Sequence, residues 1–459
     1  MPAKPASHLI RNPVSTIGGG ITTVSALLFV VAFVADSLGM EPNPYMGIVF
    51  FLVLPGAFVF GLALIPLGMV LERRRQRRVG AGVPRVWPRL DFNEPRMRTI
   101  GFIVSVLTVV NGVVVALAAY KGVEYMDSVP FCGQLCHTVM EPEFAAYQDG
   151  PHSRVTCVQC HIGPGAPWFV KSKLSGLRQV YAVTFRTYST PIPTPVTSLR
   201  PARDTCEQCH WPAKFHGDIV NVVREYASDE TNTETATTLR LHVGSGGTGP
   251  AGPTGIHWHV DPGNRIDFVA SDERREVIPY VRLTDAAGNV REYVAAGVAA
   301  DGLSKAEART MDCIDCHNRP THAFAVSAER ALDRAIGFGE VPRALPFVRR
   351  EAVALLGAAY PSQMAATEAI RTRLEQFYRA GYPEIYASRR AEVDQAIQAV
   401  GRVYRRNVFP TMRVTWGTHP NHIGHADSPG CFRCHDDNHK TADGRTIRQD
   451  CELCHTVEP

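Results

Sequence analysis

The sequence has little net charge and little of the composition that marks disordered or fibrous chains. Its 459 residues include 48 Lys and Arg against 44 Asp and Glu, which leaves a formal net charge of +4. A value this close to zero argues against a polycationic protein that binds nucleic acid. A hydrophobic share of 45% and a charged share of 20% argue against disorder and collagen-like repeats.

Ionisable residues are missing from three long apolar runs near the start of the chain. The runs cover residues 17–35, 45–71 and 99–120 and contain no Asp, Glu, Lys or Arg. Each reaches the roughly 20 residues that span a bilayer core as an α-helix. We therefore expect three transmembrane helices, and their lack of charge argues against a proton pump.

The loop between the second and third runs is basic. Residues 72–98 hold nine arginines but only three acidic residues, and short basic loops lie on the cytoplasmic side of a membrane. The N-terminus is then expected in the cytoplasm and everything after Tyr120 outside it. An alternative interpretation treats the first run as a cleaved signal peptide, which would leave the other two helices in the same orientation.

No cysteine is left over for a structural disulfide, because all 12 fall into six close pairs. A histidine directly follows every pair, and C-x-x-C-H is the attachment motif of c-type haem. Its two thiols bond to the porphyrin and its histidine binds the iron. A lone C-x-x-C also suits zinc or thiol redox chemistry, but six pairs that all precede a histidine predict six covalent haems. The pairs with their histidines are Cys132/Cys136–His137, Cys157/Cys160–His161, Cys206/Cys209–His210, Cys313/Cys316–His317, Cys431/Cys434–His435 and Cys451/Cys454–His455.

The haem motifs also bear on topology and fold. Attachment of c-type haem is expected on the periplasmic face of a bacterial inner membrane, in agreement with the basic loop. In the external part, residues 276–296 predict a β-hairpin, residues 244–255 a loop and residues 323–406 helices. The expected fold is mostly α, with sparse regular structure around stacked c-type haems. Its expected parts are a three-helix transmembrane domain in 1–122, a tetrahaem region in 123–325 with a β-rich insertion around 218–300, and a helical segment with a C-terminal dihaem region in 326–459.

Histidines outside the motifs are numerous enough to give every iron a second imidazole. Ten remain when the six motif histidines and His8 are set aside. His425 and His439 flank the fifth motif, and His257 and His259 would face the same side if they lay on a strand. Each of the ten could equally be an ordinary surface or core histidine. Seven are predicted iron ligands, namely His152, His216, His257, His259, His322, His425 and His439, and the other three are His242, His419 and His422.

Several stretches resemble the NapC/NirT family of membrane-anchored multihaem cytochromes c. They are residues 131–140, His152 five residues before Cys157, the run 168–181, and the motif ending at His317 with His322 five residues later. The resemblance covers roughly residues 125–215 and 310–325, and it implies quinol oxidation with electrons passed along a haem wire. It also implies that His152 pairs with His317, and His322 with His161. Three membrane helices and two additional haem motifs look more like inner-membrane cytochromes that feed extracellular electron transfer.

The first haem and the quinol site have their own candidates. In the family, the first haem uses a methionine shortly after its motif, which implies Met140. The longer spacing of the first cysteine pair leaves open whether Met140, His137 or both bind this iron. Some members ligate a haem with lysine in the stretch that holds Lys171 and Lys173. Because quinol oxidation releases protons, Glu141 and these lysines are candidate proton acceptors beside the first haem, and with Met140 they are the predicted quinol-site residues.

Two functions fit these observations. The first is a quinol dehydrogenase that passes electrons from menaquinol or another quinol to periplasmic cytochromes c or a terminal reductase, in anaerobic respiration or extracellular electron transfer. The alternative is a catalytic multihaem reductase of the nitrite type with one open haem. Six-coordinate haems cannot bind a substrate at iron. The spare histidines and the membrane helices therefore favour the electron conduit, with the lipid bilayer as a partner and no role for nucleic acid.

Overall fold

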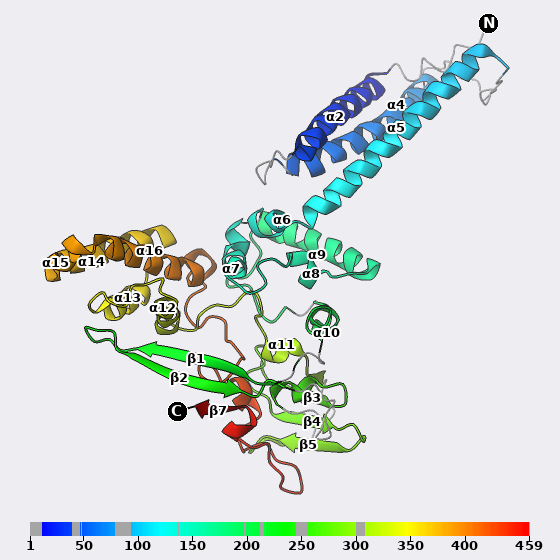
Figure 1. Cartoon of the computed structure of the whole chain (residues 1–459). Helices are drawn as coiled ribbons and strands as arrows, with labels where there is room; N and C mark the ends of the chain where they lie inside the picture. Colours follow the sequence, from blue (N-terminus) through cyan, green and yellow to red (C-terminus); the bar gives the residue numbers. More distant parts are fainter. Residues whose placement is uncertain are drawn as a thin grey trace. The chain divides into compact units, whose positions relative to one another are not determined.

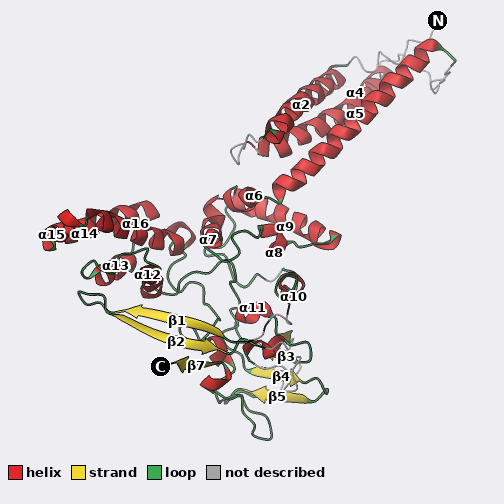
Figure 2. Ribbon diagram, in the orientation of Figure 1, coloured by secondary structure: helices red, strands yellow, loops and turns green. Residues whose placement is uncertain are grey.

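The computed structural model describes residues 12–38, 46, 48–78, 93–135, 137–196, 199–211, 215, 217–244, 255–299 and 308–458. The chain divides into two compact units, Met1–Leu135 and Cys136–Pro459. Figure 1 follows the chain through its elements, and Figure 2 separates helices from strands. The finer division predicted at residues 122 and 325 stays a prediction.

Three apolar helices make up most of the first unit. Helix α2 spans Pro13–Ser37, the short π-helix η1 (Val49–Val53) continues into α4 (Leu54–Arg78), and α5 spans Pro95–Met126. All three stretches are long and apolar enough to cross a bilayer. The prediction of three membrane-spanning helices is confirmed, and the turn expected around residues 39–44 lies outside the described residues.

Small residues bring α2 and α4 close together. A Cβ atom added to Gly18 would lie 2.8 Å from the Gly61 carbonyl oxygen, and one added to Gly68 would lie 2.5 Å from Ser15 Oγ. Ser15 Oγ also donates a hydrogen bond of 2.8 Å to the carbonyl oxygen of Ile65. Close packing through glycine with interhelical hydrogen bonds is typical of helix pairs in membranes, where burial of apolar surface gives no advantage over lipid.

Short helical turns carry the haem motifs. Asp312 begins one of them by accepting a hydrogen bond of 2.6 Å from the backbone N–H of Cys313, as expected of an N-terminal cap. In the first unit, α6 (Val129–Gln134) holds Cys132. In the second unit the turns are α7 (His137–Gln148), α8 (Cys157–His161), α10 (Ala202–Cys206), α11 (Cys313–Cys316), η6 (Gly430–Arg433) and η7 (Cys451–Leu453), and the longer α9 (Ala166–Thr184) follows α8.

Two antiparallel sheets lie in the second unit. The first has the order β1-β2-β7, with β1 (Ile219–Tyr226), β2 (Glu234–Leu241) and β7 (His455–Glu458). The second has the order β5-β4-β3-β6, with β3 (Arg265–Val269), β4 (Tyr280–Thr284), β5 (Val290–Val294) and β6 (Arg309–Thr310). Strands β4 and β5 pair across a turn at Asp285 in which Gly288 has φ +83°, so the predicted hairpin is confirmed.

The structure decides the local conformation around His257 and His259. The segment Ile256–Val260 forms the 3₁₀-helix η3 rather than a strand, so the condition under which the two residues would face the same side is not met. Most of the loop predicted over residues 244–255 lies outside the described residues.

Five helices after the fourth motif form a separate apolar core. They are α12 (Ala328–Gly337), α13 (Val348–Leu356), α14 (Gln363–Gly381), α15 (Pro383–Ser388) and α16 (Arg390–Asn407). Ile370, Leu374 and Tyr378 recur every four residues along α14 and are fully buried against Leu332 and Val400. This core confirms the helices predicted over residues 323–406 and, with the rest of the chain, the mostly helical fold with a small sheet region.

Candidate functional site

Ten imidazole rings of the second unit form five close pairs. Each pair joins the histidine of a haem motif to a histidine from elsewhere in the chain. The distances between ring centres are 6.2 Å for His161 and His322, 6.0 Å for His210 and His152, 6.3 Å for His317 and His257, 5.7 Å for His435 and His259, and 6.0 Å for His455 and His425.

These distances fit an iron atom between the two rings of each pair. Imidazoles bound on opposite sides of one metal, with metal–nitrogen bonds of about 2 Å each, have their ring centres about 6 Å apart. Each pair also stands beside the two cysteines of its own motif, which would hold the porphyrin. The residues of the second to sixth motifs therefore fit covalent haem with two axial histidines.

Hydrogen bonds to the backbone orient five of these rings. The Nδ1 atoms of His152, His257, His259, His322 and His435 lie 2.8–3.2 Å from carbonyl oxygens. A ring that donates from Nδ1 to a carbonyl keeps Nε2 deprotonated and available to a metal. The backbone thus selects the tautomer that an axial ligand needs.

Burial also favours the neutral form of the paired rings. Desolvation lowers the pKa of His161 and of His317 below the ordinary value of 6.5, and the nearby rings of His322 and His257 act in the same direction. Burial likewise lowers the pKa of His259. A neutral imidazole is the form that binds a metal.

The cysteines place successive motifs next to one another. The Cys206 side chain of the third motif lies within hydrogen-bonding reach of the Cys313 side chain of the fourth. Burial raises the pKa of Cys160, Cys316 and Cys454, and in each case a cysteine of the adjoining motif contributes, namely Cys206, Cys431 and again Cys431. The second to sixth motifs therefore follow one another in space in the order in which they occur in the chain.

A buried carboxylate connects the fourth and fifth motifs. The Asp315 side chain, 1% exposed, accepts hydrogen bonds of 2.8 Å from Arg275 and from Arg309. Arg433, between the cysteines of the fifth motif, donates to the Asp315 carbonyl oxygen at 2.6 Å and to the Arg275 carbonyl oxygen at 2.9 Å. These contacts fix the two haem-binding turns relative to each other.

Comparison with known proteins agrees with this geometry. Residues 94–193 match a family model described as the NapC/NirT cytochrome c family, N-terminal region. The chain is 42% identical over 462 residues to the cytochrome c-type protein ImcH of Geobacter sulfurreducens, and the alignment covers all of this chain and 90% of that protein. The chain belongs to the NapC/NirT cytochrome c family. No solved structure matches it.

Membership of the NapC/NirT family confirms the resemblance seen in the sequence. A cytochrome c carries covalently bound haem, so the protein binds c-type haem, and the assignment of all six C-x-x-C-H motifs as attachment sites stays a prediction. With three helices able to cross a bilayer, the protein is a membrane-anchored multihaem cytochrome.

The expected partner of one family histidine is corrected. His152 lies beside His210 of the third motif, and His317 lies beside His257 instead. The NapC/NirT resemblance implied that His152 pairs with His317, but His257 of η3 takes that place. The His322 ring does lie beside His161, and its role as a ligand stays a prediction.

His439 is not placed as an iron ligand. Its ring is 2% exposed, with Nδ1 2.8 Å from an Asp436 carboxylate oxygen and Nε2 2.7 Å from the Ile278 carbonyl oxygen. Both ring nitrogens are occupied, which argues against the prediction that His439 binds iron. His216 lies outside the described residues. The Nδ1 atom of His242 lies 3.1 Å from an Asp218 carboxylate oxygen.

Two further buried histidines stand apart from the five pairs. Burial lowers the pKa of His419 and of His422 to about 4, with Arg319 and Arg433 respectively acting in the same direction. Neither ring nitrogen of His422 has a hydrogen-bond partner in the part of the chain that the structure describes. Both rings are therefore neutral near pH 7.

The candidates for the first haem and the quinol site lie on two helices of the second unit. Met140 is half-buried on α7, one turn after His137, and Glu141 next to it is exposed. On α9 the Lys171 ammonium lies 4.6 Å from the centre of the Trp168 ring, and Lys173 lies 4.7 Å from that of Phe169. Cys136 and the His137 side chain lie outside the described residues.

Sequence reasoning missed Glu143. Its carboxylate accepts two hydrogen bonds of 3.0 Å from Arg319, and its carbonyl oxygen lies 2.9 Å from His322 Nδ1. Glu143 therefore orients a ring of the pair at the second motif. A single glutamate on a short helix belongs to no motif, so no pattern along the chain indicated this role.

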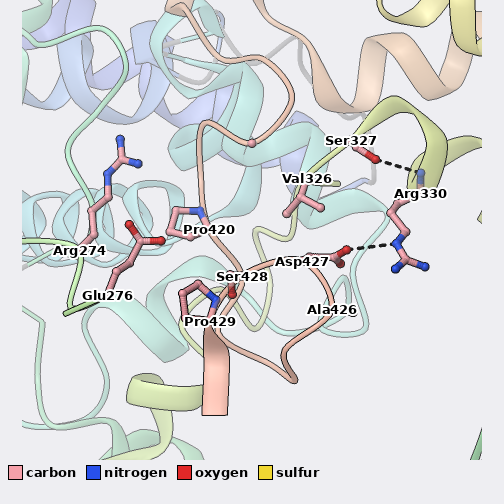
Figure 3. Close-up of a pocket in the computed structure, with 11 residues that line it drawn as sticks. Arg274, Glu276, Val326, Ser327, Arg330, Pro420, Ala426, Asp427, Ser428 and Pro429 are labelled. Carbon is pink, nitrogen blue, oxygen red and sulfur yellow. Dashed lines mark hydrogen bonds and ion pairs between the residues drawn. The ribbon is translucent and has the colours of Figure 1, made fainter. Parts of the chain in front are cut away.

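A polar cavity of about 450 Å³ lies beside the loop that carries His422 and His425. Figure 3 shows its lining, where Arg330 of α12 is paired with Asp427 of the loop at 3.1 Å. Arg274 and Glu276 line the cavity as well, and no cysteine or histidine of a haem motif does.

Proposed function

We propose that this protein oxidises menaquinol or another quinol at the membrane and passes the electrons along six c-type haems to periplasmic cytochromes or a terminal reductase. The five imidazole pairs carry the proposal. Bound haem supplies one-electron chemistry at iron, and two axial histidines leave no position there for a substrate. Such sites suit electron transfer rather than catalysis.

The order of the motifs supports a continuous path. Cysteines of the second and third, third and fourth, fourth and fifth, and fifth and sixth motifs are near neighbours. The contacts of Arg433 with the turn at Asp315 hold two of these sites in place. A rigid series of neighbouring sites suits electron transfer along the chain of motifs, from the second to the sixth.

The membrane helices support entry from the lipid phase. Quinol is apolar and stays in the bilayer, and α5 ends at Met126, six residues before Cys132. The first motif is thus tethered near the interface. The basic loop at residues 72–98 favours a cytoplasmic N-terminus and a periplasmic haem unit in a bacterial inner membrane.

Helix α7 would supply the ligand to the first iron. His137 begins α7 and Met140 lies three residues later, so the two positions share one face of the helix. Met140, His137 or both are therefore the proposed ligands from α7.

Oxidation of quinol also needs groups that accept protons. Glu141, Lys171 and Lys173 are the candidates, because they carry ionisable side chains on α7 and α9 of the family region. Their role is to take up the protons released as electrons leave for the first haem.

The test compares two reductants. We expect Met140→Ala and Lys173→Ala each to slow reduction by a menaquinol analogue in proteoliposomes more than they slow reduction by dithionite. Lys440→Ala, at an exposed position of the second unit, is the matched control. Equal slowing with both donors, or none with either, would place quinol entry elsewhere.

The alternative of a nitrite-type reductase requires one open haem. The second to sixth motif histidines all have a partner ring, so only the first iron is left for this role. A dominant high-spin haem that binds nitrite in the wild-type protein would favour the reductase over the conduit.

A further inference from the structure

Helix α9 exposes a continuous apolar stripe. Val170, Leu174, Leu177 and Tyr181 are 56%, 64%, 69% and 59% exposed, and Phe185 just beyond the helix is 63% exposed. Their spacing of three or four residues places them on one face of the helix. Isolated apolar side chains on a surface are ordinary, but an exposed stripe of this length indicates an interaction site.

Part of the opposite side of α9 packs on the second unit. Phe169, Ser172 and Val183 on that side are half-buried, and Val183 packs against the core cluster that contains Val139 and Phe324. The stripe therefore points away from that cluster. The residues of the second unit that the structure describes leave the stripe exposed.

Charge around the stripe has one sign. Between Asp149 and Asp204 the sequence has no acidic residue but seven basic ones. Lys171 and Arg178 flank the stripe on α9, and Trp168 stands at the beginning of the helix. The seven basic residues are Arg154, Lys171, Lys173, Arg178, Arg186, Arg200 and Arg203.

We propose that α9 lies in the lipid interface, with its stripe among the acyl chains and its basic residues at the level of anionic headgroups. An apolar face flanked by lysine, arginine and aromatic residues is the pattern of an interfacial helix. The occupant is lipid rather than a soluble protein because only ten residues separate the end of α5 from the start of α7. The same chain that spans the bilayer thus keeps this face within reach of it.

The inference does not depend on quinol chemistry. An interfacial α9 would still anchor the haem unit if electrons entered elsewhere, and its test measures depth in the membrane rather than electron transfer. If both this inference and the proposed function hold, Lys171 and Lys173 stand at the depth where a quinol headgroup resides.

The experiment measures the depth of spin labels in the haem-loaded protein. Leu177→Cys and Gln179→Cys are labelled after reconstitution into vesicles of phosphatidylglycerol and phosphatidylethanolamine, since the native cysteines are held in thioether bonds. Gln179 is exposed on the far side of the same helix and serves as the first control position. Met364→Cys, at a position 81% exposed on α14, carries a third label that stays in water. We expect the Leu177 label to be accessible to oxygen and shielded from a water-soluble nickel complex, and the other two labels to show the reverse.

Two results would overturn the proposal. Access of the nickel complex to both α9 labels would show that the stripe faces water. Shielding of the Leu177 label from both reagents would show that protein or haem covers it. As a measurement that needs no substitution, a lipid-borne carbene photolabel should react with residues 170–185 of the wild-type protein in the same vesicles, and its absence from that stretch would count equally against an interfacial helix.

Discussion

Replacing His152 by alanine should open the iron of the third motif. The His152 ring centre lies 6.0 Å from that of His210, while the cysteines of that motif hold the haem covalently. Removing the ring therefore takes away one axial ligand without releasing the cofactor. The variant should gain a high-spin haem that binds carbon monoxide.

The expected size of the effect follows from the motif count. One iron of six loses a ligand, so carbon monoxide binding should rise by one per protein, about a sixth of the total haem. The lost hydrogen bond should by itself cost about 1 kcal/mol of stability, since His152 Nδ1 contacts a single carbonyl oxygen, that of Pro320, at 3.2 Å, and the lost bond to iron adds to that cost.

A second substitution identifies which haem has opened. Carbon monoxide binding should disappear when Cys206→Ala and Cys209→Ala are added to His152→Ala, because the opened haem is then no longer attached. It should persist when Cys313→Ala and Cys316→Ala are added instead. His439→Ala, whose ring nitrogens are both hydrogen bonded, is the control and should gain no such haem. The opposite pattern for the two cysteine pairs would restore the pairing implied by the family and refute the one read from ring distances.

Three further predictions concern the haem unit. Intact-protein mass should show six covalent haems, including the one at the wider Cys132–Cys136 pair; five would mean that this motif is defective. Asp315→Ala should lower the free energy of unfolding by about 3 kcal/mol, because two arginines lose a buried partner; a thermal midpoint equal to that of the wild type would contradict this. The pKa of His419 and of His422 is about 4 when folded, against an ordinary value of 6.5, so the folded state binds fewer protons and stability present above pH 6.5 should be lost as the pH falls towards 4. Replacing both histidines by phenylalanine should make the thermal midpoint fall less steeply as the pH is lowered over that range. An unchanged slope of midpoint against pH would assign the acid sensitivity to other groups.

Local patterns were enough to predict much of the fold. The three apolar runs, the hairpin around Asp285 and the helices of residues 323–406 all follow from periodicity and turn residues that lie close together in the sequence. The cysteine pairs likewise define the attachment sites, since each motif is contained within five or six residues.

The pairing of the histidines could not be predicted in the same way. His257 and His259 lie in one helical turn, yet their rings reach the fourth and fifth motifs respectively. His439 lies four residues after His435 but points to Ile278. Which rings meet depends on contacts between distant segments, and these leave no periodic signal along the chain.

If the second unit is exported as proposed, the five imidazole pairs also imply an order in which the irons of the second to sixth motifs gain their second histidine. A pair can close only when its later member has left the membrane, and those later members are His210, His317, His322, His435 and His455. Irons would therefore gain their second histidine in the order third, fourth, second, fifth and sixth motif. The second motif emerges before the third and fourth but is closed after both. A nascent chain halted just before His322 would thus have a second histidine at the irons of the third and fourth motifs. The iron of the second motif would still lack one.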